Sequence, residues 1–394
     1  MLKGFKTEID IKEEHIRKIN QSIGICRYLY NSYLAKNQEL YQQFKDGLID
    51  KKQAFMSACD FDKYINNEIK TQEDFKWINE CGSKARKKSI CNAETAFKKF
   101  FKGESKFPRF KKKKNQDVKI YFPKNNRTDW FVERHRIKIP TLGWVKLKEY
   151  GYIPVDSIVK SGTVSKKADR YYVSILVEED IKVNTKSYSK GIGVDLGIKD
   201  FAICSNGVTK KNINKSSIVK KVEKKFKREQ RKLSRKYESL KLKNKKMKGK
   251  ATRQNIQKQI VKVQKLHQRL TNIRTDYINK TVNALVKQKP SFITIEDLNV
   301  SGMMKNRHLS KAIAQQKFYE FRTKLISKAN QNDVEIRIVN RWYPSSKTCS
   351  CCGNIKKDLK LSDRVYKCDT CEFVIDRDFN ASINLRNAKE YKIA

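Results

Sequence analysis

The chain has 394 residues, with 89 Lys and Arg against 42 Asp and Glu, so its formal net charge at pH 7 is +47. A polyanionic partner would offset the self-repulsion of this charge, whereas solvated lysines of a Lys-biased proteome would explain only part of it. No apolar run approaches the roughly 20 residues that cross a bilayer, and the N-terminal MLKGFKTEID is not a signal peptide. We therefore expect a cytoplasmic protein that binds nucleic acid and no membrane.

The N-terminal region combines one strand pattern with a long helical region. Residues 2–9 alternate as in a strand, and residues 13–101 carry apolar side chains at helical spacing. Gly82 and Ser83 interrupt the helical pattern before a helix over 84–101. On the polar face of that helix we expect Arg86, Lys87, Lys88, Lys98 and Lys99.

The stretch 104–189 is typical of short β-strands. Alternating runs such as VKIYF, RIKIP, WVKLK and YYVSILV lie between turn residues. Prolines separate these runs at Pro108, Pro123, Pro140 and Pro154. A series of alternating runs with such punctuation predicts a β-barrel or a sheet of short strands.

The C-terminal half has an α/β pattern. GIGVDLGIKDFAICSNG contains two apolar runs joined by a polar turn, which predicts a β-hairpin. Residues 217–288 are very basic and apolar at roughly every third or fourth position, so we expect two long helices separated near Gly249. Strands at 291–300 and 334–340, with a helix over 312–330 between them, complete an RNase H-type mixed sheet.

Three carboxylates stand at the boundaries of these elements. Asp195 follows an apolar strand, Glu296 follows another, and Asp378 precedes the helical ASINLRNA. Each also has an ordinary structural explanation: a tight turn for Asp195, an exposed sheet edge for Glu296 and a helix N-cap for Asp378. None of the three identifies a catalytic site alone.

Together, the three acids predict metal-dependent phosphodiester cleavage if they converge at one edge of the sheet. Converging carboxylates repel one another unless cations lie between them. Two Mg²⁺ ions about 3.5–4 Å apart can bind the attacking water and the leaving oxygen of a phosphodiester. The sequence does not establish that the acids meet.

Four cysteines have the spacing of a zinc site. They are Cys349, Cys352, Cys368 and Cys371, in the pattern C-x₂-C-x₁₅-C-x₂-C. An intracellular protein keeps its thiols reduced, so metal ligation is favoured over disulfides. Four thiolates leave no open coordination position, which indicates one structural Zn²⁺. We expect the fifth thiol, Cys351, to bind no metal, and Glu372 stands where the second knuckle would often have Gly.

The motifs and their order resemble the TnpB family of transposon-encoded, RNA-guided nucleases, which is related to Fanzor proteins and to type V CRISPR effectors. The resemblance is carried by GIGVDLGIKDFA, ITIEDLNVSGM, SSKTCSCCG with YKCDTC, and DRDFNASINL, in that order. LKGFKTEI, CRYLYNSYL and FPRFKKKK also look like TnpB. The resemblance covers essentially the whole chain.

The resemblance implies a multidomain α+β fold. It predicts a wedge-like β-barrel (1–9 and 106–189), an inserted helical recognition lobe (10–105), a RuvC-type RNase H-like nuclease domain (190–345 and 373–394) containing the basic helical hairpin 217–288, and an inserted zinc ribbon (346–372). The three catalytic acids that bind Mg²⁺ would be Asp195, Glu296 and Asp378. In the D-R-D-x-N-A pattern the second Asp is the family's catalytic one, so the resemblance favours Asp378 over Asp376.

The resemblance also implies the partners. A guide RNA from the transposon end would pair with double-stranded target DNA, and the protein would read a short adjacent DNA motif. The helix over 84–101 is the candidate for reading that motif, and the basic hairpin would contact RNA or heteroduplex. The candidate nucleic-acid contacts are Lys84, Lys88, Arg109, Lys111, Lys112, Arg228 and Arg231. A monomer is favoured as the oligomeric state.

Three other functions are kept as alternatives. An RNA-guided repressor that does not cut is disfavoured by the intact acids. A DNA-only transposase or junction resolvase would act without RNA, and a basic RNA-binding module would have no activity to lose on mutation of Glu296. An ATP-driven helicase is not expected, because the chain contains no G-x-x-x-x-G-K-[ST] phosphate loop.

Overall fold

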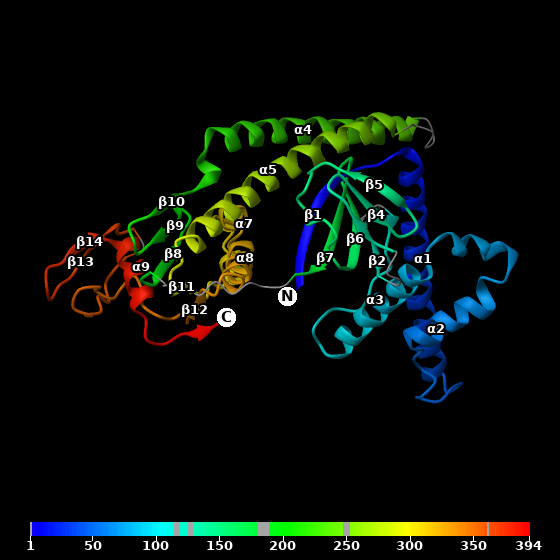
Figure 1. Ribbon diagram of the computed structural model, residues 1–394, viewed down its shortest axis with the longest axis horizontal. Helices are drawn as coiled ribbons and strands as arrows, with labels where there is room; N and C mark the ends of the chain where they lie inside the picture. The colour runs from blue at the N-terminus through cyan, green and yellow to red at the C-terminus, as the bar shows by residue number, and fades with distance from the viewer. Residues whose placement is uncertain (1, 114–118, 125–128, 180–188, 247–252, 361) are drawn as a thin grey trace. The chain divides into compact units, whose positions relative to one another are not determined.

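The computed structural model describes residues 2–113, 119–124, 129–179, 189–246, 253–360 and 362–394 (Figure 1). The chain divides into two compact units, Met1–Asp180 and Ile181–Ala394. Over the described ranges, no helix is both long and apolar enough to cross a membrane. The fold combines helices with two large sheets, in agreement with the expected α+β class.

The first unit contains a seven-stranded antiparallel sheet of order β2-β6-β7-β1-β5-β4-β3. Its strands are β1 (Leu2–Asp10), β2 (Lys119–Pro123), β3 (Phe131–Val132), β4 (Arg136–Ile139), β5 (Gly143–Leu147), β6 (Val159–Lys167) and β7 (Arg170–Glu178). The alternating runs between the prolines therefore form strands, as the sequence predicts.

The sheet is open, so the expectation of a closed barrel is wrong. Strands β2 and β3 end the strand order, and no ladder joins them within the described part of the sheet. Strand β3 has only two residues, which offer few backbone groups for closure. Instead, the Trp130 ring packs on Gly162 of β6, where an added Cβ would lie 2.2 Å from the ring. Side-chain packing thus joins the start of β3 to β6 without a closing ladder.

Helices of the first unit pack into one core with this sheet. They are α1 (Glu13–Lys45), α2 (Ala58–Tyr64), η1 (Ile65–Ile69), η2 (Glu73–Glu80) and α3 (Ser83–Phe101). Tyr33 of α1 is fully buried and makes edge-to-face contacts with Phe61 and Phe97. Arg86 does not lie on the polar face of α3 as predicted: it is buried and donates a hydrogen bond to the Ile78 carbonyl (3.2 Å), which compensates its burial.

The second unit contains a six-stranded mixed sheet of order β10-β9-β8-β11-β12-β15. Its strands are β8 (Ile192–Leu196), β9 (Asp200–Cys204), β10 (Thr209–Lys211), β11 (Phe292–Glu296), β12 (Glu335–Val339) and β15 (Lys392–Ile393). Strands β8 and β9 form the predicted hairpin, and β11 runs parallel to both β8 and β12. A separate two-stranded ribbon pairs β13 (Val365–Lys367) with β14 (Val374–Asp376).

Helices cover both faces of the six-stranded sheet. The helices of the second unit are η4 (Ile213–Lys215), α4 (Ser217–Lys246), α5 (Gln254–Val286), α6 (Val300–Met303), α7 (Ser310–Gln316), α8 (Phe318–Asn330) and α9 (Arg377–Asn387). Apolar side chains of α5, α7 and α8 form the core with β8, β9, β11 and β12. Helix α9 packs on β8, β9 and β11 from the other face.

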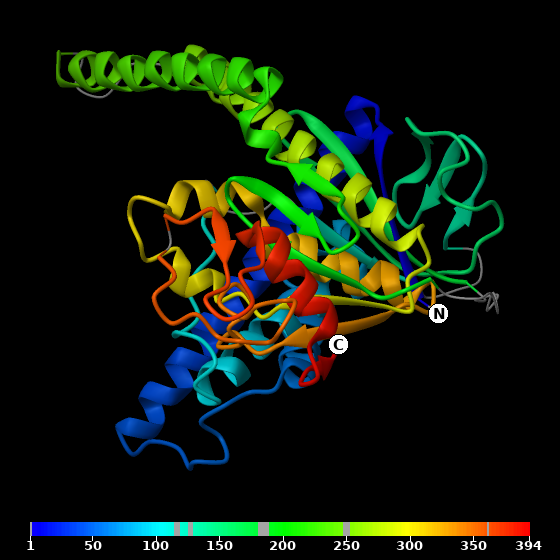
Figure 2. The ribbon, with the colours of Figure 1, turned by 90° about the vertical axis from the view of Figure 1, so that its left-hand side faces the viewer.

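Helices α4 and α5 form the predicted basic pair. They lie side by side and extend beyond the six-stranded sheet (Figure 2). A small apolar cluster of Val219, Val222 and Leu270 joins them near the sheet, and Gln259 donates a 2.8 Å hydrogen bond to buried Glu229 farther along. Gly249, where the sequence suggests a break, lies outside the described residues.

Candidate functional site

The alternation of strand residues places two of the predicted acids on one face of the sheet. In β8, Ile192 and Val194 point into the core with α5 and α8. Asp195 is therefore on the opposite face, which α9 covers. In β11, Ile293 and Ile295 belong to the same core, so Glu296 also lies on the α9 face. The parallel register pairs Ile295 with Val194, which makes Asp195 and Glu296 neighbours at the carboxyl ends of adjacent strands.

Gly193 allows α9 to lie directly on β8. A Cβ on Gly193 would stand 2.0 Å from the Ser382 carbonyl oxygen and 2.4 Å from the Arg386 nitrogen, both in the backbone of α9. Any side chain at this position would push the helix away from the strand. The closely packed helix brings its first turn, which contains Asp378, toward the acids of the sheet.

The start of α9 distinguishes the roles of its two aspartates. The Asp376 carboxylate is the N-cap and accepts hydrogen bonds from the backbone N–H groups of Asp378 (3.0 Å) and Phe379 (2.9 Å). The Asp378 side chain is not the cap, which removes the structural explanation considered from the sequence. It pairs instead with the guanidinium of Arg377 (2.8 Å) and lies 3.8 Å from that of Arg364.

The electrostatics of Asp195 reflect its burial and the negative charges of the two other predicted acids. Burial, together with the negative charges of Asp378 and Glu296, raises the pKa of Asp195 to about 7, against the opposing effect of Arg377. Burial, with a contribution from Asp297, also raises the pKa of Glu296 to about 7. A cation between these carboxyl groups would favour their ionised forms.

Asp297, which directly follows Glu296, is held by two arginines that the sequence did not single out. Arg322 of α8 donates a 2.5 Å hydrogen bond to one carboxylate oxygen, and Arg341, after β12, donates a 3.1 Å bond to the other. These bonds keep the pKa of Asp297 below its ordinary value. The backbone N–H of Asp297 also donates to the Val339 carbonyl (3.0 Å). The end of β11 is therefore fixed on three sides.

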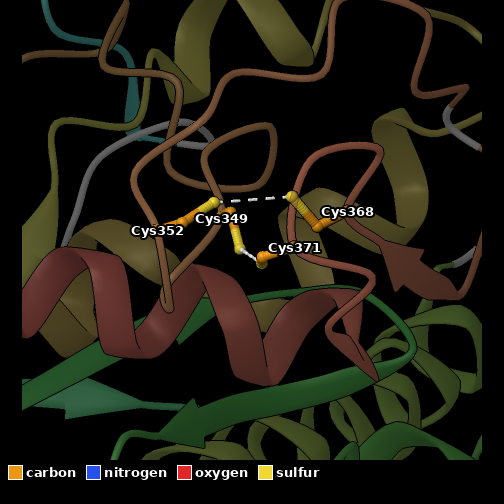
Figure 3. A group of neighbouring side chains, drawn as sticks. All are labelled: Cys349, Cys352, Cys368 and Cys371. Carbon is orange, nitrogen blue, oxygen red and sulfur yellow. Dashed lines mark hydrogen bonds between the residues drawn. The ribbon is translucent and has the colours of Figure 1, made fainter.

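The four predicted zinc ligands converge (Figure 3). Their Sγ atoms all lie within 4.8 Å of one another, with 3.7 Å between Cys349 and Cys371 and 3.6 Å between Cys352 and Cys368. A tetrahedron with Zn–S bonds of about 2.3 Å has sulfur atoms about 3.8 Å apart. Backbone N–H groups of Cys371 and Thr370 lower the pKa of Cys368 to about 6, which favours the thiolate that zinc requires. The donor set fits one structural Zn²⁺.

Two matching turns position these thiols. The residue after each second cysteine has a left-handed backbone, with φ +78° at Gly353 and +56° at Glu372. Glu372, which stands where the second knuckle would often have Gly, thus adopts the same turn as Gly353. A glutamate tolerates this left-handed conformation less well than a glycine. Cys351 is exposed and does not belong to the group of converging thiols.

Comparisons with known proteins agree with these features. Residues 318–385 match the family model of the Cas12f1-like TNB domain, residues 173–307 match OrfB_IS605, described as a probable transposase, and residues 1–46 match its helix-turn-helix model. In the last range the structure has a strand followed by one continuous helix, α1. Together the three matches span more than half of the chain.

Relatives extend the match over the whole length. An Escherichia coli K12 protein named "Putative RNA-guided DNA endonuclease InsQ" is 29% identical over 98% of this chain and 91% of its own length. "TnpB-like protein L79" of Acanthamoeba polyphaga mimivirus is 29% identical over 59% of this chain and 44% of its own length. The chain belongs to the TnpB family. A solved Cas12f1–sgRNA–target DNA complex shares the fold of this TnpB-family chain, with a TM-score of 0.60, 17% identity, and coverage of 97% of this chain and 84% of that one.

In the first unit of this TnpB-family chain, the candidate nucleic-acid contacts differ in their surroundings. Lys84, Lys88, Arg109 and Lys112 are exposed. Lys111 is half-buried against α1, with its ammonium nitrogen 3.6 Å from the ring centroid of Tyr30, and burial lowers its pKa. Its role includes joining the 107–113 segment to the helix, where its backbone N–H also donates to Asn31.

In the second unit, Arg228 and Arg231 lie on an exposed and strongly basic stretch of α4. They line a shallow hollow of about 560 Å³ together with four lysines, namely Lys221, Lys224, Lys225 and Lys227. No acidic side chain lines this hollow. A surface with this charge suits a phosphate backbone.

Proposed function

We propose that this protein is an RNA-guided DNA endonuclease that hydrolyses phosphodiester bonds at Asp195, Glu296 and Asp378. The observation that carries the proposal is the placement of Asp195 and Glu296 at the ends of the adjacent strands β8 and β11, with α9, which carries Asp378, packed on the same face. The names of the full-length relatives support guidance by RNA and DNA as the substrate. The net charge of +47 suits two nucleic-acid partners.

The carboxylates would suit two Mg²⁺ ions, because Mg²⁺ prefers hard oxygen ligands with negative charge. When bound, the two ions would polarise the scissile phosphate and activate water. Asp195 would contribute the central ligand, since both other acids influence its pKa. The cap formed by Asp376 would fix the first turn of α9 and so orient Asp378. The two arginines on Asp297 would hold the backbone that carries Glu296.

The zinc ribbon would support this site from outside. Asn380 of α9 is fully buried; its amide donates to the Thr348 carbonyl (2.7 Å) and its oxygen accepts from the Ser350 N–H (3.0 Å). Asn384 donates to the same carbonyl (2.6 Å). These bonds connect the first zinc knuckle to the helix that carries Asp378. Zn²⁺ would therefore stabilise the catalytic helix without taking part in the chemistry.

The guide RNA and the protein would each recognise a different part of the target DNA. A guide RNA from the transposon end would select the target strand by base pairing, and the protein would read a short adjacent motif. Exposed Lys84 and Lys88 of α3 are the proposed motif contacts, and the basic face of α4 with Arg228 and Arg231 is the proposed contact to RNA or heteroduplex. The wedge would consist of residues 1–9 and 106–189. The recognition lobe would consist of residues 10–105.

The test begins with the RNA. The protein is expressed with its native flanking sequence, and the RNA that co-purifies after a high-salt wash is sequenced. We expect one discrete RNA that ends at the transposon boundary. Heterogeneous RNA that salt removes, together with nicking of transposon ends or four-way junctions without RNA, would contradict guidance and favour a DNA-only nuclease.

A further inference from the structure

Trp342 is an exposed aromatic residue in a loop whose conformation is fixed. Its side chain is 85% exposed, more than any other large apolar side chain in the described ranges. Isolated apolar residues on a surface need no explanation by themselves. The surroundings of Trp342 supply the reason to assign it a function.

Both neighbours of Trp342 are bound to the rest of the second unit. On one side, Arg341 donates to the Asp297 carboxylate (3.1 Å). On the other, the Tyr343 hydroxyl donates to the Asn384 carbonyl of α9 (3.3 Å). The backbone N–H of Trp342 itself donates to the Asn340 side chain (3.0 Å). These bonds anchor the chain on both sides of Trp342, and the exposed indole extends from this anchored stretch.

The loop leaves the sheet beside the proposed catalytic site. Strand β12 is parallel to β11, and its last residue, Val339, is the register partner of Glu296. Trp342 follows three residues later, at the same carboxyl edge. Arg341 is joined to the residue next to Glu296, and Tyr343 is joined to the helix that carries Asp378. The two anchors of Trp342 therefore lead to the elements of two of the three acids.

We propose that Trp342 is a stacking platform for a nucleobase of the DNA strand that enters the site of Asp195, Glu296 and Asp378. This proposal rests on the proposed function. A flat, largely exposed indole suits stacking against a base. Every base has an aromatic face, so the platform would hold a single strand without selecting a sequence. An apolar protein partner is the competing occupant, and the net charge of +47 favours nucleic acid over it.

The experiment compares a base-bearing strand with a baseless one. Asp195→Ala protein, purified with its RNA, is titrated with oligothymidylate and with an abasic oligomer of equal length and charge, each about 10 nucleotides. We expect tighter binding of oligothymidylate, and Trp342→Ala to weaken that binding about 5- to 100-fold while leaving the abasic oligomer unaffected. Trp342→Phe should keep most of the preference. Tyr319→Ala, at an aromatic residue 74% exposed on α8, should keep all of it.

Fluorescence supplies a second measurement that does not depend on affinity. The emission of Trp342, obtained as the difference between the Asp195→Ala protein and its Trp342→Phe derivative, should be quenched by oligothymidylate and not by the abasic oligomer. Unquenched emission, or equal binding of both oligomers before and after Trp342→Ala, would overturn the proposal. Neither measurement requires cleavage, so the two proposals can fail separately. If the protein stacks bases but never cuts guided targets, the proposed function is refuted and the stacking proposal is not. Equal unfolding temperatures of the variants confirm that their folds are intact.

Discussion

At the scale of single residues, burial and two neighbouring carboxylates disfavour the ionised form of the Asp195 carboxyl group, and bound cations should favour it. Its folded-state pKa of about 7 lies above the ordinary 3.8, so the folded state holds a proton that the unfolded state releases. This difference lowers the free energy of unfolding progressively as pH rises from about 4 to 7, and by a constant amount above 7. Below pH 4 the cost is absent, because both states are protonated.

Asp195→Asn should therefore stabilise the protein in buffer without Mg²⁺. We expect a gain of up to about 4 kcal/mol at pH 8 that disappears near pH 4, measured by denaturant unfolding at a series of pH values. Adding Mg²⁺ should stabilise the native protein and leave the variant unchanged. A pH-independent difference, or equal stabilisation of both proteins by Mg²⁺, would show that Asp195 does not share a cation site.

Glu372 offers a second change at one residue. Its φ of +56° is unfavourable for a side chain and natural for glycine. Glu372→Gly should raise the free energy of unfolding by about 0.5–1 kcal/mol, because the strain in the knuckle turn is removed. A thermal melt of the zinc-loaded protein measures the effect. Gly353→Glu, at the matching turn, should lower stability; if both changes act in the same direction, the turn argument fails.

At the scale of elements, the zinc ribbon and α9 should lose order together. Cys352 and Cys351 are both exposed, and only Cys352 belongs to the converging thiols. We expect Cys352→Ser to lose bound zinc and cleavage activity, because the ribbon then releases the helix that carries Asp378. Cys351→Ser should keep one zinc per chain and full activity. Metal analysis with a cleavage assay measures both, and full activity in verified zinc-free protein would contradict the coupling.

The elements also show how far sequence reasoning reaches. The strand hairpin, the long helix pair and the cysteine spacing are local patterns, and the structure has them. The choice of Asp378 over Asp376 came from the family resemblance, and the cap on α9 now supplies a physical reason for it. The two arginines on Asp297 and the anchors of Trp342 join residues tens of positions apart, and no local pattern encodes such pairs.

Two local expectations failed for the same kind of reason. Arg86 was assigned to a polar helix face, but the Ile78 carbonyl satisfies it inside the core. The strand pattern predicts a barrel or a sheet and the family resemblance implies the barrel, yet closure depends on pairing between β2 and β3, which the strand pattern does not specify. In both cases tertiary contacts override a correct assignment of secondary structure.

At the scale of the whole molecule, the positive charge should dominate affinity for nucleic acid. Each phosphate that the protein neutralises releases counterions, so log K should fall with log salt by about 0.7–0.9 per contact. A titration of the RNA complex between low and physiological salt measures the slope. Changing Arg228 and Arg231 together to Gln should reduce it by about 1–2. A flat salt dependence would contradict the interpretation of the charge.

In the proposed function, RNA selects the DNA that this protein cuts, and the three acids carry out the cleavage. The most direct measurement rewrites the guide segment of the co-purified RNA and follows cleavage of two plasmids, one matching the old guide and one the new, each with a library of flanking sequences. We predict that cleavage moves to the new target, requires Mg²⁺, selects a short flanking motif and is lost in Asp195→Ala, Glu296→Gln and Asp378→Ala. Cleavage that ignores the guide, or persists in these variants, would contradict the claim.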